Sequence, residues 1–398
     1  MEGLLGMRIA TVCGTRPELI KLAPLVPLLA DRFEHTYLFT GQHYSPNMVR
    51  IFVDELDAPA PDRYLDVGHS GVDALQVATG AALAEAEAEL VLVYGDTNST
   101  LAGARAARSL GVPVLHLEAG IRSFDKTMPE ERNRIEVDAL SALRLAPTRL
   151  AAWFLESIEG YTPDGNPVVG NLVVDALMKH RAIAEARPHP MGSAAGSRPY
   201  AVVTLHRQAT VDDPKVFARL LAEFGALEMD LYFPVHPRSM ARFEEFGLAW
   251  PSNLHVVEPV GYLDFIRAMS GAALLLTDSG GVQEEAVCLG IPCITLRPNT
   301  ERMESVFIGS NRLFDPSVDS GLAELVSHGL HSRSLRQRRV NPYGDGRAAE
   351  RVTALLERLA GLEPSFSFPL PADLAGGAPF ADDRALSAAA LHFHGVCG

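Results

Sequence analysis

The sequence predicts an α/β protein built from two doubly wound parallel sheets, each in its own domain. Short apolar segments alternate with helical segments along most of the chain, which is the pattern of a parallel sheet with helices on both faces. The alternation stops at residues 187–199, which are rich in proline, glycine and serine, and then starts again. Polar residues follow directly after the apolar segments, at the strand ends where such sheets bind ligands.

In the first half of the chain, the predicted strands are continuous apolar runs. Residues 90–94 (LVLVY) are the clearest case, because a strand covered on both faces has no polar side. The strands are predicted at residues 7–13, 36–40, 90–94, 112–117 and 143–147, with a strand end at 168–171; the helices at 19–29, 72–89 and 101–109; and a connection at 52–64.

The second half repeats this organisation. Its strands are predicted at residues 200–205, 231–235, 254–257, 273–277 and 292–296, and its helices at 212–224 and 282–289, with a last amphipathic helix at 348–359. We expect an N-terminal domain at residues 1–186, a C-terminal domain at 187–346, a closing helix at 347–361 and a flexible tail at 362–398. Two such domains would face a cleft, where small molecules commonly bind.

The composition indicates which kinds of partner the protein can bind. The net charge of −14 disfavours binding to nucleic acid, whose phosphate backbone is also negative. The four cysteines are scattered, which fits thiols of a reducing compartment better than disulfides. We find neither a signal-peptide pattern nor an apolar run of about 20 residues, so we expect a cytoplasmic protein that is not in a membrane.

The segment 274–302 is predicted to bind a phosphate. An apolar strand ends there at Ser279-Gly280-Gly281, and a helix follows. Glycines allow close backbone approach, and the N–H groups and dipole of a helix N-terminus attract an anion. Arg297 and Arg302, beyond the next strand, have side chains that match phosphate oxygens in pairs. The alternative is an ordinary strand-to-helix turn.

The first strand is followed by a second candidate for anion binding. Arg16 and Lys21 lie near the start of the next predicted helix, where the dipole disfavours a cation. An anion held between these two side chains would explain their position, whereas a solvated charged face is the alternative.

Three carboxylates and one histidine are candidates for acid–base chemistry. Asp96, Glu118 and Glu130 belong to one sheet edge, and carboxylates that share a site shift one another's pKa. His206 follows the first strand of the second half. Asp96 as a helix N-cap and His206 as a core histidine are the structural alternatives. For Glu285 we expect contact with a sugar hydroxyl such as ribose, with a helix-starting role as the alternative.

Cofactors and metals are not expected. The sequence has no HxxxH, no cysteine cluster and no suitable DxD turn for a metal. It also lacks GxGxxG after the first strand, which disfavours a nicotinamide cofactor.

Several motifs resemble one enzyme family along almost the whole chain, in order. They are GTRPELIKLAPL, TGQHY, GDTNSTLAGA, HLEAGIRSFDKTMPEERNR, TLHR, HPR, EPVGYLDF, TDSGGVQEEA, TLRPNTERMESV and NPYGDG. On these motifs, the chain resembles the non-hydrolysing UDP-N-acetylglucosamine 2-epimerases from about residue 7 to residue 359.

The resemblance implies two Rossmann-like domains in the glycosyltransferase-B arrangement, a homodimer, and a UDP-sugar substrate. The implied reaction converts UDP-GlcNAc to UDP-ManNAc through anti elimination of UDP to 2-acetamidoglucal, followed by re-addition. By motif, the implied catalytic residues are the acid–base carboxylates Asp96, Glu118 and Glu130, together with His206, which would act near the diphosphate. The implied UDP contacts are Arg16, Lys21, Phe265, Ser279, Gly280, Gly281, Glu285 and Arg302. Positions linked to activation by a second UDP-GlcNAc are Gln42 and His43, and we add His236 as a possible member.

Some positions depart from the family pattern. Gln208-Ala209-Thr210 stands where the family often reads xEN after HR, and Met303 replaces a proline. The main alternative is the same chemistry on a UDP-2,3-diacetamido-uronic acid. Less favoured are a hydrolysing epimerase, a glycosyltransferase of the same fold, and a UDP-sugar binder without activity.

Overall fold

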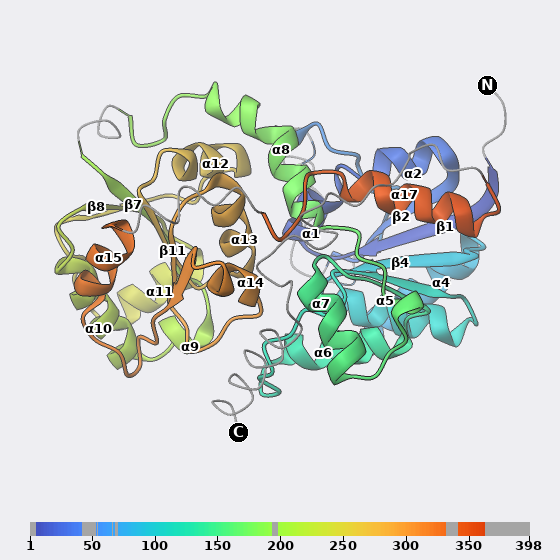
Figure 1. Ribbon diagram of the computed structural model, residues 1–398, viewed down its shortest axis with the longest axis horizontal. Coiled ribbons are helices and arrows are strands. Elements are labelled where there is room, and N and C mark those ends of the chain that lie inside the picture. The colour runs from blue at the N-terminus through green and yellow to red at the C-terminus, as the bar shows by residue number, and fades with distance from the viewer. Residues whose placement is uncertain are drawn as a thin grey trace. The chain divides into compact units, whose positions relative to one another are not determined.

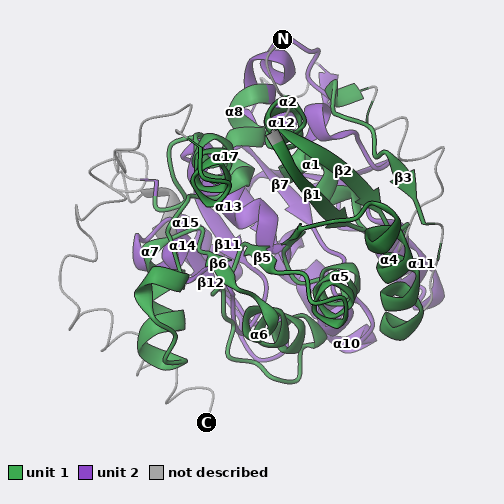
Figure 2. Cartoon of the chain, turned by 90° about the vertical axis from the view of Figure 1, so that its right-hand side faces the viewer, with its two compact units in different colours: residues 1–179, 342–398 green, residues 180–341 purple. Residues whose placement is uncertain are grey.

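The computed structural model describes residues 5–41, 53, 55–65, 67, 71–192, 198–331 and 341–362. The chain forms two compact units (Figure 2). Unit 1 comprises Met1–Lys179 with Pro342–Gly398, and unit 2 comprises His180–Asn341. Each unit contains a six-stranded parallel sheet with helices (Figure 1), which confirms the predicted α/β class with two Rossmann-like domains. The residue limits predicted for the domains stay a prediction.

The sheet of unit 1 has the strand order β3-β2-β1-β4-β5-β6. Its strands are β1 (Leu5–Cys13), β2 (Phe33–Phe39), β3 (Arg63–Tyr64), β4 (Leu90–Tyr94), β5 (Val114–Leu117) and β6 (Leu143–Leu145). The order reverses direction between β1 and β4, and the carboxyl ends at such a switch point are the usual ligand site of a doubly wound sheet.

The helices of unit 1 cover both faces of this sheet. They are α1 (Arg16–Leu22), α2 (Val26–Arg32), α4 (Val72–Glu85), α5 (Asn98–Ser109), α6 (Pro129–Leu140), α7 (Arg149–Trp153), the π-helix η1 (Phe154–Ile158), the 3₁₀ turn η2 (Pro163–Gly165), α8 (Leu172–Glu185), whose last residues enter unit 2, and α17 (Ala348–Leu359).

Alternating residues of β1 supply two separate hydrophobic layers. Ile9 and Cys13 pack with residues of α2 and α17, which lie together along one face of the sheet (Figure 1). Ala10 and Val12 pack with α4, α5 and α6 on the other face. This is the period of two that a strand imposes on its side chains, and it explains why the strand is apolar throughout.

Unit 2 repeats this topology with the strand order β12-β11-β10-β7-β8-β9. Its strands are β7 (Tyr200–Thr204), β8 (Asp230–Pro234), β9 (Leu254–Val257), β10 (Leu274–Thr277), β11 (Cys293–Thr295) and β12 (Asn311–Leu313). Its helices are α9 (Gln208–Val211), α10 (Pro214–Gly225), α11 (Pro237–Glu245), α12 (Tyr262–Ser270), α13 (Gly280–Leu289), α14 (Met303–Phe307) and α15 (Leu322–His331). The switch point lies between β7 and β10.

The sequence predictions were wrong in a few short elements. Residues 63–64, predicted as part of a connection, form the edge strand β3. The predicted strand end at 168–171 makes only an isolated bridge between Val168 and Ala146. The tail after residue 362 lies outside the described residues. None of the helices that the structure describes has the length and apolar character needed to cross a membrane.

Candidate active site

The turn after β1 is closed by a buried glutamate. Glu18, in the first turn of α1, accepts hydrogen bonds from the backbone N–H groups of Gly14 (2.7 Å) and Thr15 (2.8 Å). A side chain at position 14 would overlap Ser99, so glycine is needed where β1 approaches α5. Burial raises the pKa of Glu18, and the hydrogen bonds only partly oppose that rise. The turn fixes the start of α1, where Arg16 is the first residue.

Lys21 and Glu118 form a nearly buried ion pair. The Lys21 Nζ atom lies 2.8 Å from Glu118 Oε1, and the two side chains are 12% and 8% exposed. The same Nζ atom lies 5.3 Å from the centre of the Tyr94 ring. Asn171 donates a longer hydrogen bond of 3.5 Å to Glu118 Oε1. The structure therefore brings a residue predicted to bind UDP against one predicted to act in catalysis.

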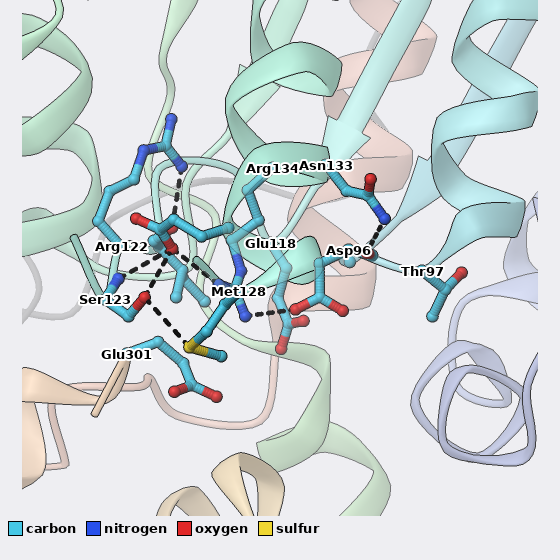
Figure 3. Close-up of polar contacts among 12 residues, drawn as sticks. Asp96, Thr97, Glu118, Arg122, Ser123, Met128, Asn133, Arg134 and Glu301 are labelled. Atoms are coloured by element: carbon cyan, nitrogen blue, oxygen red, sulfur yellow. Dashed lines mark hydrogen bonds and ion pairs between the residues drawn. The ribbon is translucent and has the colours of Figure 1, made fainter. Parts of the chain in front are cut away.

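Asp96 lies in the turn after β4, close to Glu118 (Figure 3). Arg134 of α6 forms an ion pair with the Asp96 carboxylate, and Asn133 donates to the Asp96 carbonyl at 2.9 Å. Glu118 Oε2 lies 3.5 Å from where a Cβ atom on Gly95 would stand, so both carboxylates belong to one edge of the sheet. The N-cap role considered for Asp96 is wrong, because Thr97 caps α5.

Two successive glutamates at the start of α6 have different environments. Glu131 is buried and accepts hydrogen bonds from the backbone N–H groups of Ser123 (3.0 Å) and Phe124 (2.9 Å), and it also pairs with Arg134. Glu130 is half-buried, and its carboxylate has no hydrogen-bond or ion-pair partner within the described parts of the chain. Glu131 thus orders the preceding loop, whereas Glu130 is available for a ligand.

Sequence reasoning missed three polar residues of this edge, namely Asn133, Arg134 and Asn171. Arg134 is the most important, because it contacts both Asp96 and Glu131. Arg134 lies three residues after Glu131 and four after Glu130. Because residues at these spacings share a helix face, the sequence could have indicated that Arg134 lies beside the glutamates.

In unit 2, His206 and Asp278 come from the two strands that flank the switch point. Asp278, just after β10, accepts hydrogen bonds from the backbone N–H groups of His206 (2.9 Å) and Arg207 (2.8 Å). The His206 Nδ1 atom lies 2.9 Å from Asp278 Oδ1, so this edge of the ring is turned toward the carboxylate. The His206 side chain is 40% exposed, which makes the core-histidine alternative wrong. Burial alone would raise the pKa of Asp278, but His206 and the backbone N–H groups lower it.

The glycine turn after Asp278 starts α13 as predicted. Ser279 is the N-cap, and Gly280 and Gly281 are the first two helical residues. A Cβ atom on Gly280 would stand 2.6 Å from Glu301 Oε1, whereas a Cβ atom on Gly281 would meet nothing within 4 Å. A side chain at position 280 would therefore displace the Glu301 carboxylate, whereas Gly281 leaves the helix start accessible.

The two arginines after β11 are paired with buried glutamates. Arg302 Nε lies 2.6 Å from Glu284 Oε1, and Arg297 Nη1 lies 2.9 Å from Glu301 Oε2. Burial lowers the pKa of Arg297, and the Glu301 carboxylate opposes this. These pairs hold the loop between β11 and α14; contact of Arg302 with a diphosphate stays a prediction.

The remaining predicted residues lie on separate elements of unit 2. Phe265 is half-buried on α12, and Glu285 is buried on α13. Burial raises the pKa of Tyr262, and the Glu285 carboxylate raises it further. His236 caps α11, its ring centre lies 5.8 Å from that of His206, and burial lowers its pKa. Gln42 and His43 lie outside the described residues.

The arrangement suits acid–base chemistry on an anionic ligand. Unit 1 gathers carboxylates and cations at its switch point, and unit 2 presents a histidine of fixed ring orientation beside a helix start. In the described ranges, no three His, Cys, Asp or Glu side chains are grouped so that they would hold a metal ion.

Comparison with known proteins gives one consistent result. The family model described as UDP-N-acetylglucosamine 2-epimerase matches residues 28–357. The UDP-N-acetylglucosamine 2-epimerase of Methanocaldococcus jannaschii is 40% identical over 88% of this chain and 99% of its own length. A UDP-2,3-diacetamido-2,3-dideoxy-D-glucuronate 2-epimerase of Pseudomonas aeruginosa is 36% identical over 89% of this chain and 100% of its own.

A solved structure agrees with these relatives. The crystal structure of the Methanocaldococcus jannaschii UDP-GlcNAc 2-epimerase in complex with UDP-GlcNAc and UDP has a TM-score of 0.78 and 36% identity, and the match covers 89% of this chain and 99% of that one.

Proposed function

This chain belongs to the UDP-N-acetylglucosamine 2-epimerase family, and we propose that it interconverts UDP-GlcNAc and UDP-ManNAc by inverting the sugar at C2. The observation that carries the proposal is the cluster at the switch point of unit 1. There the Asp96 and Glu118 carboxylates are each held by a cation, from Arg134 and Lys21, at one edge of the sheet. An enzyme that moves a proton at carbon needs carboxylates fixed in this way.

The proposed reaction begins with the removal of the C2 proton by a carboxylate of unit 1. The electron pair of the C2–H bond becomes the C1–C2 double bond while the C1–O bond breaks, and UDP leaves with the electrons of that bond. This gives 2-acetamidoglucal. Addition of UDP to C1 and protonation of C2 on the opposite face then give UDP-ManNAc, so no oxidant or reductant is needed.

Three carboxylates are available for these two proton transfers. We assign Asp96, Glu118 and Glu130 to this acid–base group. Glu130 has no ion-pair partner among the described residues and so accepts a proton without losing one, whereas Asp96 and Glu118 are oriented by their cations. Asp96→Asn, Glu118→Gln and Glu130→Gln should each lower kcat by roughly 10²- to 10⁴-fold, the usual range for one acid–base group.

The groups of unit 2 suit the leaving UDP. As the C1–O bond breaks, negative charge develops on the diphosphate, and the start of α13 at Ser279, Gly280 and Gly281 offers backbone N–H groups and a positive dipole end. His206 carries a proton at Nδ1 toward Asp278, so we assign its other ring nitrogen, Nε2, to the diphosphate, to which Nε2 donates when it also carries a proton. The proposed UDP contacts also include Arg16, Lys21, Phe265, Glu285 and Arg302.

A second substrate deserves a parallel test. The 36% identity to a UDP-2,3-diacetamido-2,3-dideoxy-D-glucuronate 2-epimerase favours the same chemistry on a diacetamido-uronic acid as the alternative. The two substrates share UDP and C2 chemistry and differ at C3 and C6, so relative kcat/KM values decide between them.

Proton NMR of the protein with UDP-GlcNAc in D₂O tests the proposal directly. UDP-ManNAc with deuterium at C2 would support both the reaction and the proton abstraction. Free ManNAc with UDP would identify a hydrolysing enzyme, and transfer to an acceptor without C2 exchange would identify a glycosyltransferase. If neither product nor exchange appears, even with a trace of UDP-ManNAc added as activator, the UDP-GlcNAc assignment is wrong.

We also propose an oligomeric state and a cellular location for this protein. The family resemblance supports a homodimer in the cytoplasm. Light scattering of the purified chain, whose mass is 42.9 kDa, would give about twice that mass for a dimer and would contradict the proposal at the single-chain value.

A further inference from the structure

A chain of four ionisable groups, three of them buried, lies next to the carboxylate edge of unit 1, and the proposed chemistry does not use it. His116 of β5 and Asp138 of α6 are both 0% exposed, and His116 Nδ1 lies 2.6 Å from Asp138 Oδ1. Arg122 lies 2.5 Å from Asp138 Oδ2, and Glu159 lies 2.6 Å from Arg122. The four groups alternate in sign, which lets charges be buried without leaving one unpaired.

The contacts of His116 fix its protonation state. Its Nε2 atom lies 2.7 Å from the carbonyl oxygen of Gly95, and a carbonyl oxygen only accepts. Its Nδ1 atom faces Asp138, which Arg122 keeps ionised. Burial alone would raise the pKa of Asp138, but Arg122 and His116 lower it to about 2. Both ring nitrogens must therefore donate, which only the imidazolium form does.

Each end of the His116–Asp138 pair holds a turn that carries a candidate catalytic carboxylate. His116 binds the carbonyl of Gly95, the residue before Asp96. Asp138 Oδ2 accepts a hydrogen bond of 3.2 Å from the backbone N–H of Gly120, two residues after Glu118.

The backbone of these turns is unusual. The φ angles of Gly95, Glu118 and Gly120 are 74°, 70° and 78°, in the left-handed region that side chains disfavour. At position 120 glycine is also needed for space, because a Cβ atom would overlap the carbonyl oxygen of Ala151. A non-glycine residue such as Glu118 keeps this conformation only where the surrounding structure imposes it.

We propose that His116 is a positioning residue: as an imidazolium anchored by Asp138, it fixes the turns that carry Asp96 and Glu118 relative to one another. The inference rests on the proposed function, because it assigns these two carboxylates to the same proton transfers. A displacement of about 1 Å at a reacting group lowers the rate by about 10²-fold, so loss of this anchor should appear in kcat. UDP affinity should change much less than kcat, because the anchor contacts none of the proposed UDP-binding residues directly and is linked to Lys21 only through the turn of Glu118.

The test compares His116→Gln with His35→Gln. His35 is a matched control in the same sheet, since it is partly buried and hydrogen-bonded to Thr11 at 2.8 Å but has no contact with either turn. We expect His116→Gln to lower kcat by about 10²-fold with UDP affinity within about threefold of wild type, and His35→Gln to leave both within about threefold. An equal effect of the two variants would overturn the proposal.

The variant Asp138→Asn tests the charge of His116 separately from its hydrogen bond to Gly95. The Asn amide would donate to Nδ1, so His116 becomes neutral while its Nε2–H still donates to Gly95. We expect a smaller fall in kcat, by about tenfold, because the bond to Gly95 is kept. This variant also replaces His116→Gln if the latter does not fold. A fall for Asp138→Asn as large as that for His116→Gln, or no fall for either, contradicts positioning by this bond.

Hydrogen–deuterium exchange supplies a readout that does not need turnover. Amides of residues 94–97 and 117–121 should exchange faster in folded His116→Gln than in His35→Gln. If the wild-type protein turns over neither UDP-sugar, the proposed function fails and this arm still tests whether the turns are held. If the wild type is active and exchange at both turns is unchanged in His116→Gln, the positioning role alone fails.

Discussion

The two units each contain a histidine–aspartate pair, and the pairs differ in what surrounds the histidine. In unit 1, His116 and Asp138 are both 0% exposed, and both nitrogens of the ring face acceptors. In unit 2, His206 is 40% exposed, and only Nδ1 faces its partner Asp278. The same two side chains thus form a structural anchor where both ring edges are occupied, and a candidate catalytic group where one edge is left for a ligand.

The aspartates show why burial alone does not decide the charge. Burial would raise the pKa of each, yet cations lower it for Asp138, and His206 with backbone N–H groups lowers it for Asp278. Asp175 of α8 is buried against the N–H groups of Ala348 (3.2 Å) and Ala349 (2.9 Å), and burial raises its pKa to about 6. Backbone donors without a cation do not offset desolvation there.

The largest expected effect is on folding. Asp138→Ala would leave Arg122 and His116 buried without their shared anion, so we expect a loss of about 3–5 kcal/mol in the free energy of unfolding. Asp278→Ala should cost about 1–3 kcal/mol, because it removes an acceptor from two backbone N–H groups and a half-exposed histidine. Urea denaturation measures both. If Asp278→Ala is the more destabilising variant, the distinction between the pairs is wrong.

The next effect is on catalysis. His206→Gln should lower kcat by about 10²-fold or more if His206 acts at the diphosphate, while changing stability by less than about 1 kcal/mol because the side chain is 40% exposed. His116→Gln should instead affect both activity and stability. Parallel kinetics and urea curves compare them, and a His206 variant that is unstable but active would reverse the two assignments.

The third prediction concerns pH and tests whether a cation is what separates Asp138 from Asp175. The pKa of Asp175 is about 6 in the folded protein and ordinarily about 3.8, so the folded state binds the proton more tightly. Its stabilising contribution is complete below about pH 4 and is lost as the pH rises through 6. Between pH 4 and pH 7, the free energy of unfolding of Asp175→Asn should therefore increase relative to that of wild type by on the order of 2 kcal/mol.

Asp345→Asn is the matched control for that measurement. Asp345 pairs with Arg351 at 2.7 Å, and its pKa is lowered: burial opposes the shift, and Arg351 causes it. Its contribution is present above its ordinary pKa of 3.8 and is lost as the pH falls below that value. The stability difference between Asp345→Asn and wild type should therefore stay nearly constant from about pH 4 to pH 7 and should change in the opposite direction only in more acidic solution. Parallel slopes for the two variants would contradict the account.

The smallest expected effect comes from Asp278→Asn. The Asn oxygen still accepts from the backbone N–H groups of His206 and Arg207, but the amide now donates to Nδ1. His206 would then carry its proton at Nε2 without a carboxylate to stabilise a second proton at Nδ1. Because a singly protonated ring offers the diphosphate less positive charge, we expect kcat to fall by about tenfold with little change in stability. Steady-state kinetics tests this, and unchanged kcat would show that Asp278 only caps the turn.

Much of the fold follows from local patterns in the sequence. The continuous apolar run LVLVY identified β4 with the same bounds as the structure, because a fully covered strand has no polar face. The bounds of β9 were also predicted correctly, although this edge strand contains an exposed histidine and is only partly buried. The three-residue strand β12, Asn311–Leu313, was missed, since two of its three residues are polar and only β11 beside it defines it. Polar residues after strands correctly led to Asp96, Glu118 and His206 as residues of the sheet edges.

The sequence does not reveal which side chains these polar residues contact, because the partners lie far away along the chain. Arg134 lies 38 residues from Asp96, Asp138 lies 22 from His116, and Asp278 lies 72 from His206. Nor does a sequence distinguish Glu130 from Glu131, since a helix start accepts either one, and only the loop at Ser123 determines which is buried.

Long-range ¹H–¹⁵N correlation of the protein labelled with ¹⁵N-histidine tests the central distinction most directly. The signals of His116 and His206 are assigned by their loss in His116→Gln and His206→Gln. At neutral pH the account predicts protons on both ring nitrogens of His116 and a proton on Nδ1 of His206. A neutral His116, with one ring nitrogen unprotonated, would contradict the assignment of the unit 1 pair as a charged anchor.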